Sequence, residues 1–103
     1  MVVVSVLYPA KAGARFDQAY YDATHIPMAK AAFATTGLID VKVFAGLSAA
    51  DGGPAPFVAM AHLTFESLEA MGASMGGPRG GEIRADVPNF TDIEPVIQVS
   101  AVV

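Results

Sequence analysis

The sequence has no cysteine, and only 16% of its 103 residues are charged. The absence of cysteine excludes a disulfide framework, a thiolate zinc site and a thiol nucleophile. Hydrophobic residues make up 53% of the chain, so the few polar side chains are too scarce to cover the surface of a domain of this size. We therefore expect the protein to associate with a second copy as a homodimer.

Basic residues are also few. Six Lys and Arg stand against ten Asp and Glu, a net charge of −4, and the six form no cluster. This balance argues against nucleic acid or an anionic membrane as a partner. No apolar run reaches the ~18–20 residues of a membrane span, and the first residues lack the basic start of a signal peptide. We expect a cytoplasmic protein.

The hydrophobic pattern predicts one α+β domain over residues 1–103. The first and third predicted strands are nearly continuous apolar runs, which is typical of central strands, whereas the other two carry alternation or proline and suit sheet edges. The resulting β-α-β-β-α-β order is the ferredoxin-like arrangement, with an antiparallel sheet of order 4-1-3-2. Both helices would cover one sheet face and leave the other free for the second copy. The expected elements are strands at 2–8, 39–47, 57–65 and 93–102, and helices at 16–36 and from 67 onward.

Proline and glycine predict where the helices are disturbed. Asp17 can cap the first helix and Gly37 can end it. Pro27 predicts a kink between Thr24 and Met28, because it lacks an N–H and clashes with the preceding turn. The glycine-rich segment 76–81 predicts an interruption of the second helix, followed by a short polar turn or helix at 82–87.

His25 is the first candidate for chemistry, because histidine transfers protons near neutral pH. Tyr21 and Asp22 lie about one turn before it, and Asp22 would favour the imidazolium. Pro27 frees the carbonyl of Ala23 beside the imidazole. The alternative interpretation is a surface or capping histidine next to an ordinary proline kink.

Other polar residues give weaker candidates. His62 alternates with Met60 in a central strand, where it is either a ligand-binding residue or a hydrogen-bonded core histidine. No close pair of histidines or group of carboxylates supports a metal site. Arg79 would either meet a substrate carboxylate or lie in solvent. The segment 86–95 is a rigid turn into an edge strand, or else contributes one lip of a pocket through Asn89, Phe90 and Asp92.

Taken together, these motifs resemble the EthD-like family, named for ethyl tert-butyl ether degradation. The resemblance covers nearly the whole chain and depends on the combination of Tyr-Tyr…His-x-Pro at 20–27 with Pro-Asn-x-Thr-Asp-Ile-x-Pro at 88–95. It implies a dimeric α+β barrel in which two ferredoxin-like sheets face each other. Family members usually carry Tyr in place of Phe90 and have a more regular second helix. A family site would map onto His25 and Tyr20 or Tyr21, then onto His62 and the turn at 89–92.

The resemblance implies two functions. The first is catabolism of a small hydrophobic compound by an enzyme or a component of an oxidoreductase system, with no cofactor and with cofactor-independent acid/base or monooxygenase-like chemistry. His25 would then be the general acid/base and Tyr20 or Tyr21 would orient a substrate oxygen. The alternative is a non-catalytic dimer that binds a hydrophobic ligand or supports an oxygenase system. A haem protein with His25 or His62 as axial ligand is a third hypothesis.

Overall fold

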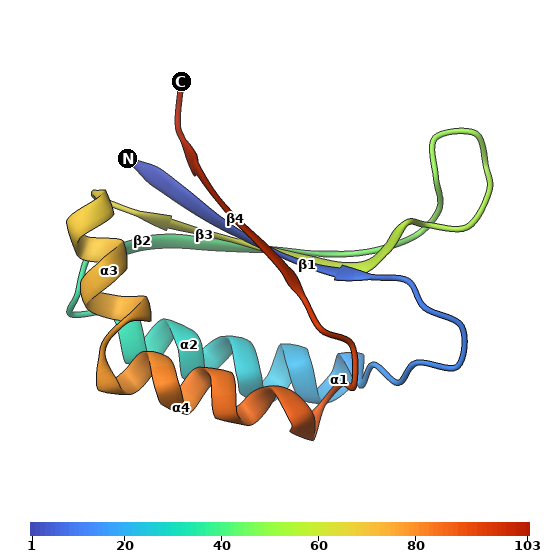
Figure 1. Cartoon of the computed structure of the whole chain (residues 1–103), viewed down its shortest axis with the longest axis horizontal. Coiled ribbons are helices and arrows are strands. Elements are labelled where there is room, and N and C mark those ends of the chain that lie inside the picture. Colours follow the sequence, from blue (N-terminus) through green and yellow to red (C-terminus); the bar gives the residue numbers. More distant parts are fainter.

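The computed structural model describes residues 1–103 and forms a sheet covered by helices on one face (Figure 1). The four strands pair antiparallel in the order β2-β3-β1-β4, which confirms the predicted ferredoxin-like α+β fold. β3 matches its predicted range, while β2 ends two residues early. The strands are β1 (Val2–Pro9), β2 (Leu38–Ala45), β3 (Phe57–Phe65) and β4 (Val96–Ala101).

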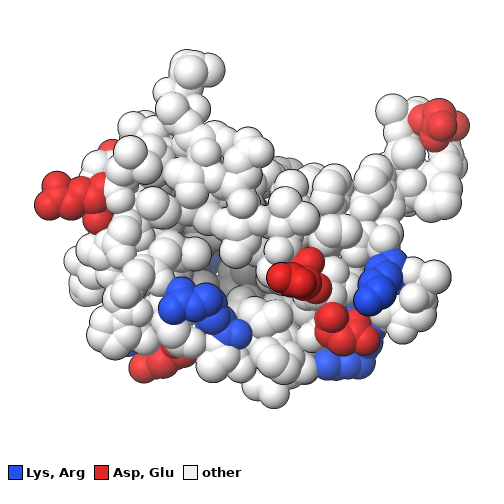
Figure 2. All heavy atoms as spheres, viewed as in Figure 1, with Lys and Arg blue, Asp and Glu red and all other residues white.

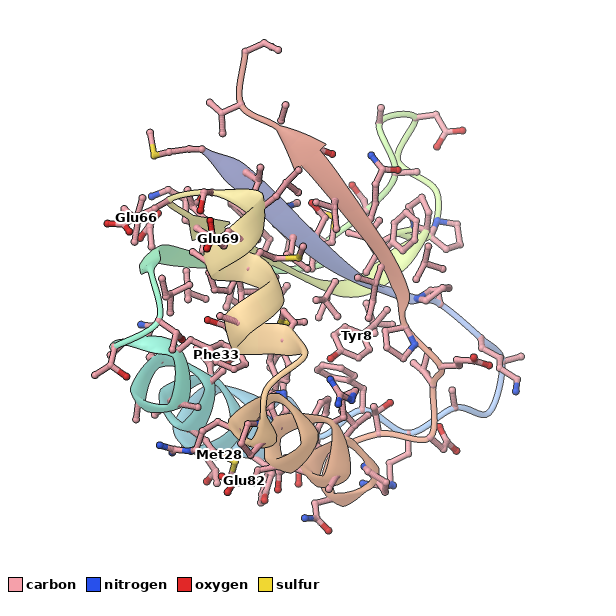
Figure 3. The ribbon with its side chains drawn as sticks, turned by 60° about the vertical axis from the view of Figure 1, so that its left-hand side comes forward. Tyr8, Met28, Phe33, Glu66, Glu69 and Glu82 are labelled. Atoms are coloured by element: carbon pink, nitrogen blue, oxygen red, sulfur yellow. The ribbon has the colours of Figure 1, made fainter.

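The core lies between the sheet and the helices. Alternate residues of β1 and β3 point toward the helices and are almost fully buried, for example Val4, Ala61 and Phe65. They pack against Phe33 of helix α2 (Ile26–Phe33). Figure 3 shows Tyr8 and Phe33 directed into the space between the two layers. This face therefore holds the structure together through apolar burial.

The first helical region is continuous but changes its hydrogen-bonding pattern. It begins at α1 (Gln18–Tyr20), where the Asp17 carboxylate accepts from the Tyr20 N–H as predicted. It continues as a π-helical turn, η1 (Tyr21–His25), and then as α2. The expected kink around Pro27 is thus replaced by a wider turn before the proline, which lies in the first turn of α2 where a missing N–H costs little. The region ends before Gly37, whose φ of +97° suits glycine.

The predicted interruption of the second helix is present but is limited to Gly76 and Gly77, because the chain is helical again from Pro78. Helix α3 (Leu68–Met75) is capped by Ser67, as expected, and after two residues α4 begins (Pro78–Asp86). Pro78 suits the first turn of a helix. A Cβ at Gly80 would lie 2.2 Å from the Met75 carbonyl oxygen, so this glycine lets α4 pass close to the end of α3. The pattern of glycines therefore reflects close packing of two helices and not a loop.

The last strand is shorter than predicted. Residues 87–89 form a single 3-10 turn, η2 (Val87–Asn89), and the chain runs without regular structure to Pro95 before β4 begins. Thr91 makes an isolated bridge with Phe16. This connection fastens the segment 86–95 against the start of the first helical region.

The second face of the sheet has no helix over it (Figure 1). Strand register places three rows of side chains across it, and the rows differ in polarity. One outer row is apolar and the middle row is polar. The apolar row is Phe44, Met60, Leu7 and Val96, and the middle row is Lys42, His62, Ser5 and Gln98. No helix of the chain has the length and apolarity that would let it cross a membrane.

Candidate active site

An apolar cavity of about 270 Å³ lies between the sheet and the helices. Figure 2 shows it as a hollow in a surface that carries few charged groups. Thirteen of its sixteen lining residues are hydrophobic. All four strands contribute to it, together with residues of η1, α2, α3 and α4 and Val87 of η2. The lining residues are Val6, Tyr8, Tyr21, His25, Ile26, Ala29, Phe33, Val41, Ala61, Leu63, Met75, Ile83, Arg84, Val87, Pro95 and Ile97.

His25 lies at the wall of this cavity and is 5% exposed. Its Nδ1 is 2.8 Å from Oδ2 of Asp86, at the end of α4. Its Nε2 has no hydrogen-bond partner in the protein. Every fully buried side-chain nitrogen or oxygen of the chain has such a partner, so Nε2 is not fully buried. The small exposed surface of the imidazole therefore includes Nε2, and His25 is one of the residues that line the cavity. Two aromatic rings contact the imidazole. The ring centroid of Tyr21, which stacks on it, is 5.6 Å away, and that of Phe90 is 4.5 Å away.

Asp86 is held by three side chains. Its Oδ2 pairs with His25, and its Oδ1 accepts from the Tyr20 hydroxyl at 2.7 Å and from the Asn89 amide at 2.9 Å. Burial of Asp86 by itself would raise the pKa of its carboxyl, but the bonds from Tyr20, Asn89 and His25 outweigh burial and lower this pKa below its ordinary value of 3.8. Asp86 is therefore ionised at neutral pH, although it is 93% buried.

The charge on Asp86 decides the tautomer of His25. An ionised carboxylate only accepts hydrogen bonds, so Nδ1 of the imidazole must carry the proton that it shares with Oδ2. In the neutral ring, Nε2 then presents its lone pair to the cavity. The arrangement can accept a proton from a bound molecule and stabilise the imidazolium that forms.

The sequence did not identify Asp86 as the partner of His25. Asp22, which was expected in that place, is exposed and accepts from the Gln18 amide at 2.8 Å, so it lies on the outer side of the helix. Asp86 is 61 residues away in the sequence, beyond the reach of helical spacing. The available signal was its position at the start of the segment Asp-Val-Pro-Asn, whose residue types by themselves indicate a turn.

The two predicted tyrosines have different places. Tyr21 is buried and lines the cavity, whereas Tyr20 lies behind His25 and contacts Asp86. Tyr8 of β1, not expected from the sequence, also lines the cavity, and its ring packs edge-on against Tyr21. Burial raises the pKa of Tyr8 to about 12 and raises that of Tyr21 further. Both phenols therefore stay protonated at neutral pH and can donate to an oxygen of a ligand.

The turn at 86–95 supports the site from behind. None of Asn89, Phe90 and Asp92 lines the cavity. Asn89 binds Asp86, Phe90 is fully buried against the imidazole, and the Asp92 carboxylate accepts from the Arg15 N–H at 2.8 Å. Asn89 and Phe90 therefore contact Asp86 and His25 from behind the cavity, whereas Asp92 holds the backbone of Arg15.

His62 and Met60 do not join this site, because both point to the uncovered face of the sheet. His62 Nδ1 lies 2.8 Å from the Ser5 hydroxyl, and its ring packs edge-on against Phe44. The two histidines of the chain therefore lie on opposite sides of one sheet. No group of three or more His, Asp or Glu side chains is arranged to hold a metal ion.

Comparison with known proteins identifies the family. The family model of the EthD domain matches residues 13–94. The chain belongs to the EthD family. The structure of an EthD-like protein from Ralstonia eutropha JMP134 is 44% identical, with a TM-score of 0.90 over 99% of this chain and 91% of that one. No curated protein matches the sequence.

More distant structures share only the fold. An EthD family protein from Bacillus halodurans C-125 is 20% identical, with a TM-score of 0.80 over 100% of this chain and 99% of that one. A putative antibiotic biosynthesis monooxygenase from Bordetella bronchiseptica is 12% identical, with a TM-score of 0.59 over 99% and 97% of the two chains. The resemblance seen in the sequence motifs is thereby confirmed, and the EthD fold of this chain extends to proteins of little sequence similarity.

Proposed function

We propose that this EthD protein is a proton-transfer enzyme of small-molecule catabolism, with His25 as the general acid/base. The observation that carries the proposal is the 2.8 Å bond between His25 Nδ1 and Asp86 at the wall of an apolar cavity, which leaves Nε2 without a protein partner. Nε2 would remove a proton from an acidic C–H or O–H of the substrate, leaving a substrate anion and an imidazolium paired with Asp86. Return of the proton to another atom would complete an isomerisation or prepare a bond cleavage.

The environment supports this role. The lining of the cavity is mostly hydrophobic, which strengthens the electrostatic effect of Asp86 on the imidazolium. The phenols of Tyr21 and Tyr8 line the same cavity and would orient a substrate oxygen. Tyr20 and Asn89 are positioning residues, since they act on His25 only through Asp86.

The test compares the two histidines. His25→Asn should lower kcat/KM about 10²- to 10⁴-fold toward any compound that the wild type converts in a panel of small ethers, lactones and quinol-like compounds. His62→Asn is the matched control and should retain turnover, because His62 lies outside the cavity. Equal turnover by wild type and His25→Asn would remove His25 from the mechanism.

A second candidate function is ligand binding without chemistry, as an accessory to an oxygenase system. It is favoured by the apolar lining, in which thirteen of sixteen residues are hydrophobic. A pair of variants distinguishes the two functions. Ala29→Leu adds carbon atoms to the cavity wall and should impair both functions, whereas His25→Asn should impair only the enzyme.

We further propose that the uncovered sheet face pairs with a second copy, as the dimeric barrel implied by the family requires. The support is the exposed apolar row at one end of that face, in which Phe44 is 47% and Val96 52% exposed. Phe44→Glu should shift sedimentation equilibrium toward the single subunit. Leu47→Glu, in the exposed loop after β2 and 95% exposed in the wild type, should leave the assembly unchanged. Wild-type protein that sediments as a single subunit at micromolar concentration would contradict this pairing.

A further inference from the structure

Arg84 of α4 is the one side chain with a permanent positive charge among the residues that line the cavity. No Asp or Glu lines it. The ion pairs of the chain are His25–Asp86, Lys42–Asp40 and Arg79–Glu82, so the Arg84 guanidinium has no carboxylate within 4.0 Å. Arg84 is exposed and also lines the cavity, so it lies at the opening of the cavity and not in its interior.

The guanidinium is also held in place. Its Nη1 donates to the Met75 carbonyl at 2.7 Å, at the end of α3. This bond uses one of five N–H donors and leaves the others for a ligand. Gly80 allows α4 to approach Met75 so closely, and the same helix carries Asp86. One helix therefore supplies both the partner of the imidazole and the cation of the cavity.

We propose that Arg84 binds the carboxylate of the substrate, which is a small apolar monocarboxylate. This inference rests on the proposed function, since it assigns the substrate class of the same cavity. The carboxylate would bind the guanidinium at the opening of the cavity; Figure 2 shows basic atoms on one side of the hollow and acidic atoms on the other. The apolar body would fill the interior between sheet and helices. A volume of about 270 Å³ is near the lower end of known ligand pockets, so a single ring or a short branched chain fits best.

The charge distribution on α4 separates Arg84 from its neighbour. Both arginines are exposed, but Arg79, considered from the sequence as a carboxylate-binding residue, pairs with Glu82 at 3.1 Å and does not line the cavity. Figure 3 shows Glu82 on the outer side of the helices. Arg79 therefore serves as a matched control on the same helix.

The test uses two probes of matched shape, cyclohexanecarboxylate and cyclohexylmethanol, in calorimetric titrations of the whole protein. The wild type should bind the carboxylate more tightly than the alcohol. Arg84→Met should weaken carboxylate binding about tenfold or more, because a charge-assisted bond is lost, and should leave alcohol binding unchanged. Arg79→Met should match the wild type.

A structural role of Arg84 is tested by Arg84→Gln. Its amide can still donate to the Met75 carbonyl but carries no charge, so carboxylate binding should stay weak while the melting temperature returns toward that of the wild type. Full carboxylate affinity in Arg84→Gln or Arg84→Met, or a wild type that prefers the alcohol, would overturn the role of Arg84 and leave the proton-transfer function standing. A wild type that binds neither probe would contradict the carboxylate assignment. Binding of the carboxylate probe by His25→Asn would show that Arg84 acts independently of the imidazole.

Discussion

The two histidines of the chain lie on opposite sides of the sheet and have different surroundings. On the covered face, His25 is buried, bonded to a carboxylate and directed at a cavity. On the uncovered face, His62 is half-buried and bonded to the hydroxyl of Ser5. A hydroxyl can donate or accept, so it does not fix the tautomer of His62, whereas the ionised Asp86 fixes that of His25. The surroundings of an imidazole, more than its presence in a motif, decide what chemistry it can perform.

The largest expected difference between the two faces concerns stability. Phe33→Ala removes a side chain that is 1% exposed and should lower the free energy of unfolding by about 3–5 kcal/mol. Phe44→Ala, on the uncovered face, should change the stability of the single subunit by less than about 1 kcal/mol and act instead on self-association. Urea unfolding at low protein concentration measures both. A loss from Phe44→Ala as large as that from Phe33→Ala would show that the uncovered face belongs to the core of one subunit.

A smaller effect is expected from the charge beside His25. Asp86→Asn should cost about 1.5–3 kcal/mol at pH 7, since hydrogen bonds to a charged group are lost. The folded-state pKa of Asp86 is lowered, so its contribution is complete above pH 3.8 and is lost as the pH falls through the lower folded-state value. The difference between wild type and variant should therefore shrink in acid. Urea titrations between pH 2 and pH 7 test this, and a difference that does not change with pH would contradict an ionised Asp86.

The smallest effect is expected on the uncovered face. Ser5→Ala removes the partner of His62 and should cost about 0.5–1 kcal/mol, because water can replace a hydroxyl at a half-buried imidazole. The matched change on the other face is Tyr20→Phe, which removes one bond to Asp86. It should lower kcat through the placement of His25, whereas Ser5→Ala should leave kcat unchanged. A fall in kcat for Ser5→Ala would show that the uncovered face of the sheet affects the site on the covered face.

The sequence was sufficient to predict the sheet and its strand order. Hydrophobic runs and alternation identified the strands, and Asp17 and Ser67 marked two helix starts. Local rules failed at Gly80, because glycine here permits a close helix contact that no spacing reveals. The β4 boundary was also wrong, since the Ile93 N–H donates to the Thr91 hydroxyl in place of a ladder, and Thr91 itself is bonded to the Arg15 carbonyl.

The candidate site was only half predictable. The Tyr-Tyr…His-x-Pro motif pointed to His25, but its carboxylate partner comes from the far end of α4. Arg84 gave no signal, because nothing in its local sequence distinguishes it from Arg79, which does not line the cavity. Contacts between distant segments depend on tertiary packing, which helical spacing does not describe.

The most direct test of the account is the tautomer of His25, observed by two-dimensional ¹H–¹⁵N correlation of the side-chain nitrogens at alkaline pH. The chain has two histidines, so His62→Asn leaves a single set of signals to assign. The account predicts a protonated Nδ1 and an unprotonated Nε2 in the neutral ring, with the pattern lost in Asp86→Asn. A neutral ring protonated at Nε2 would contradict it, because the cavity would then face a donor and not a base.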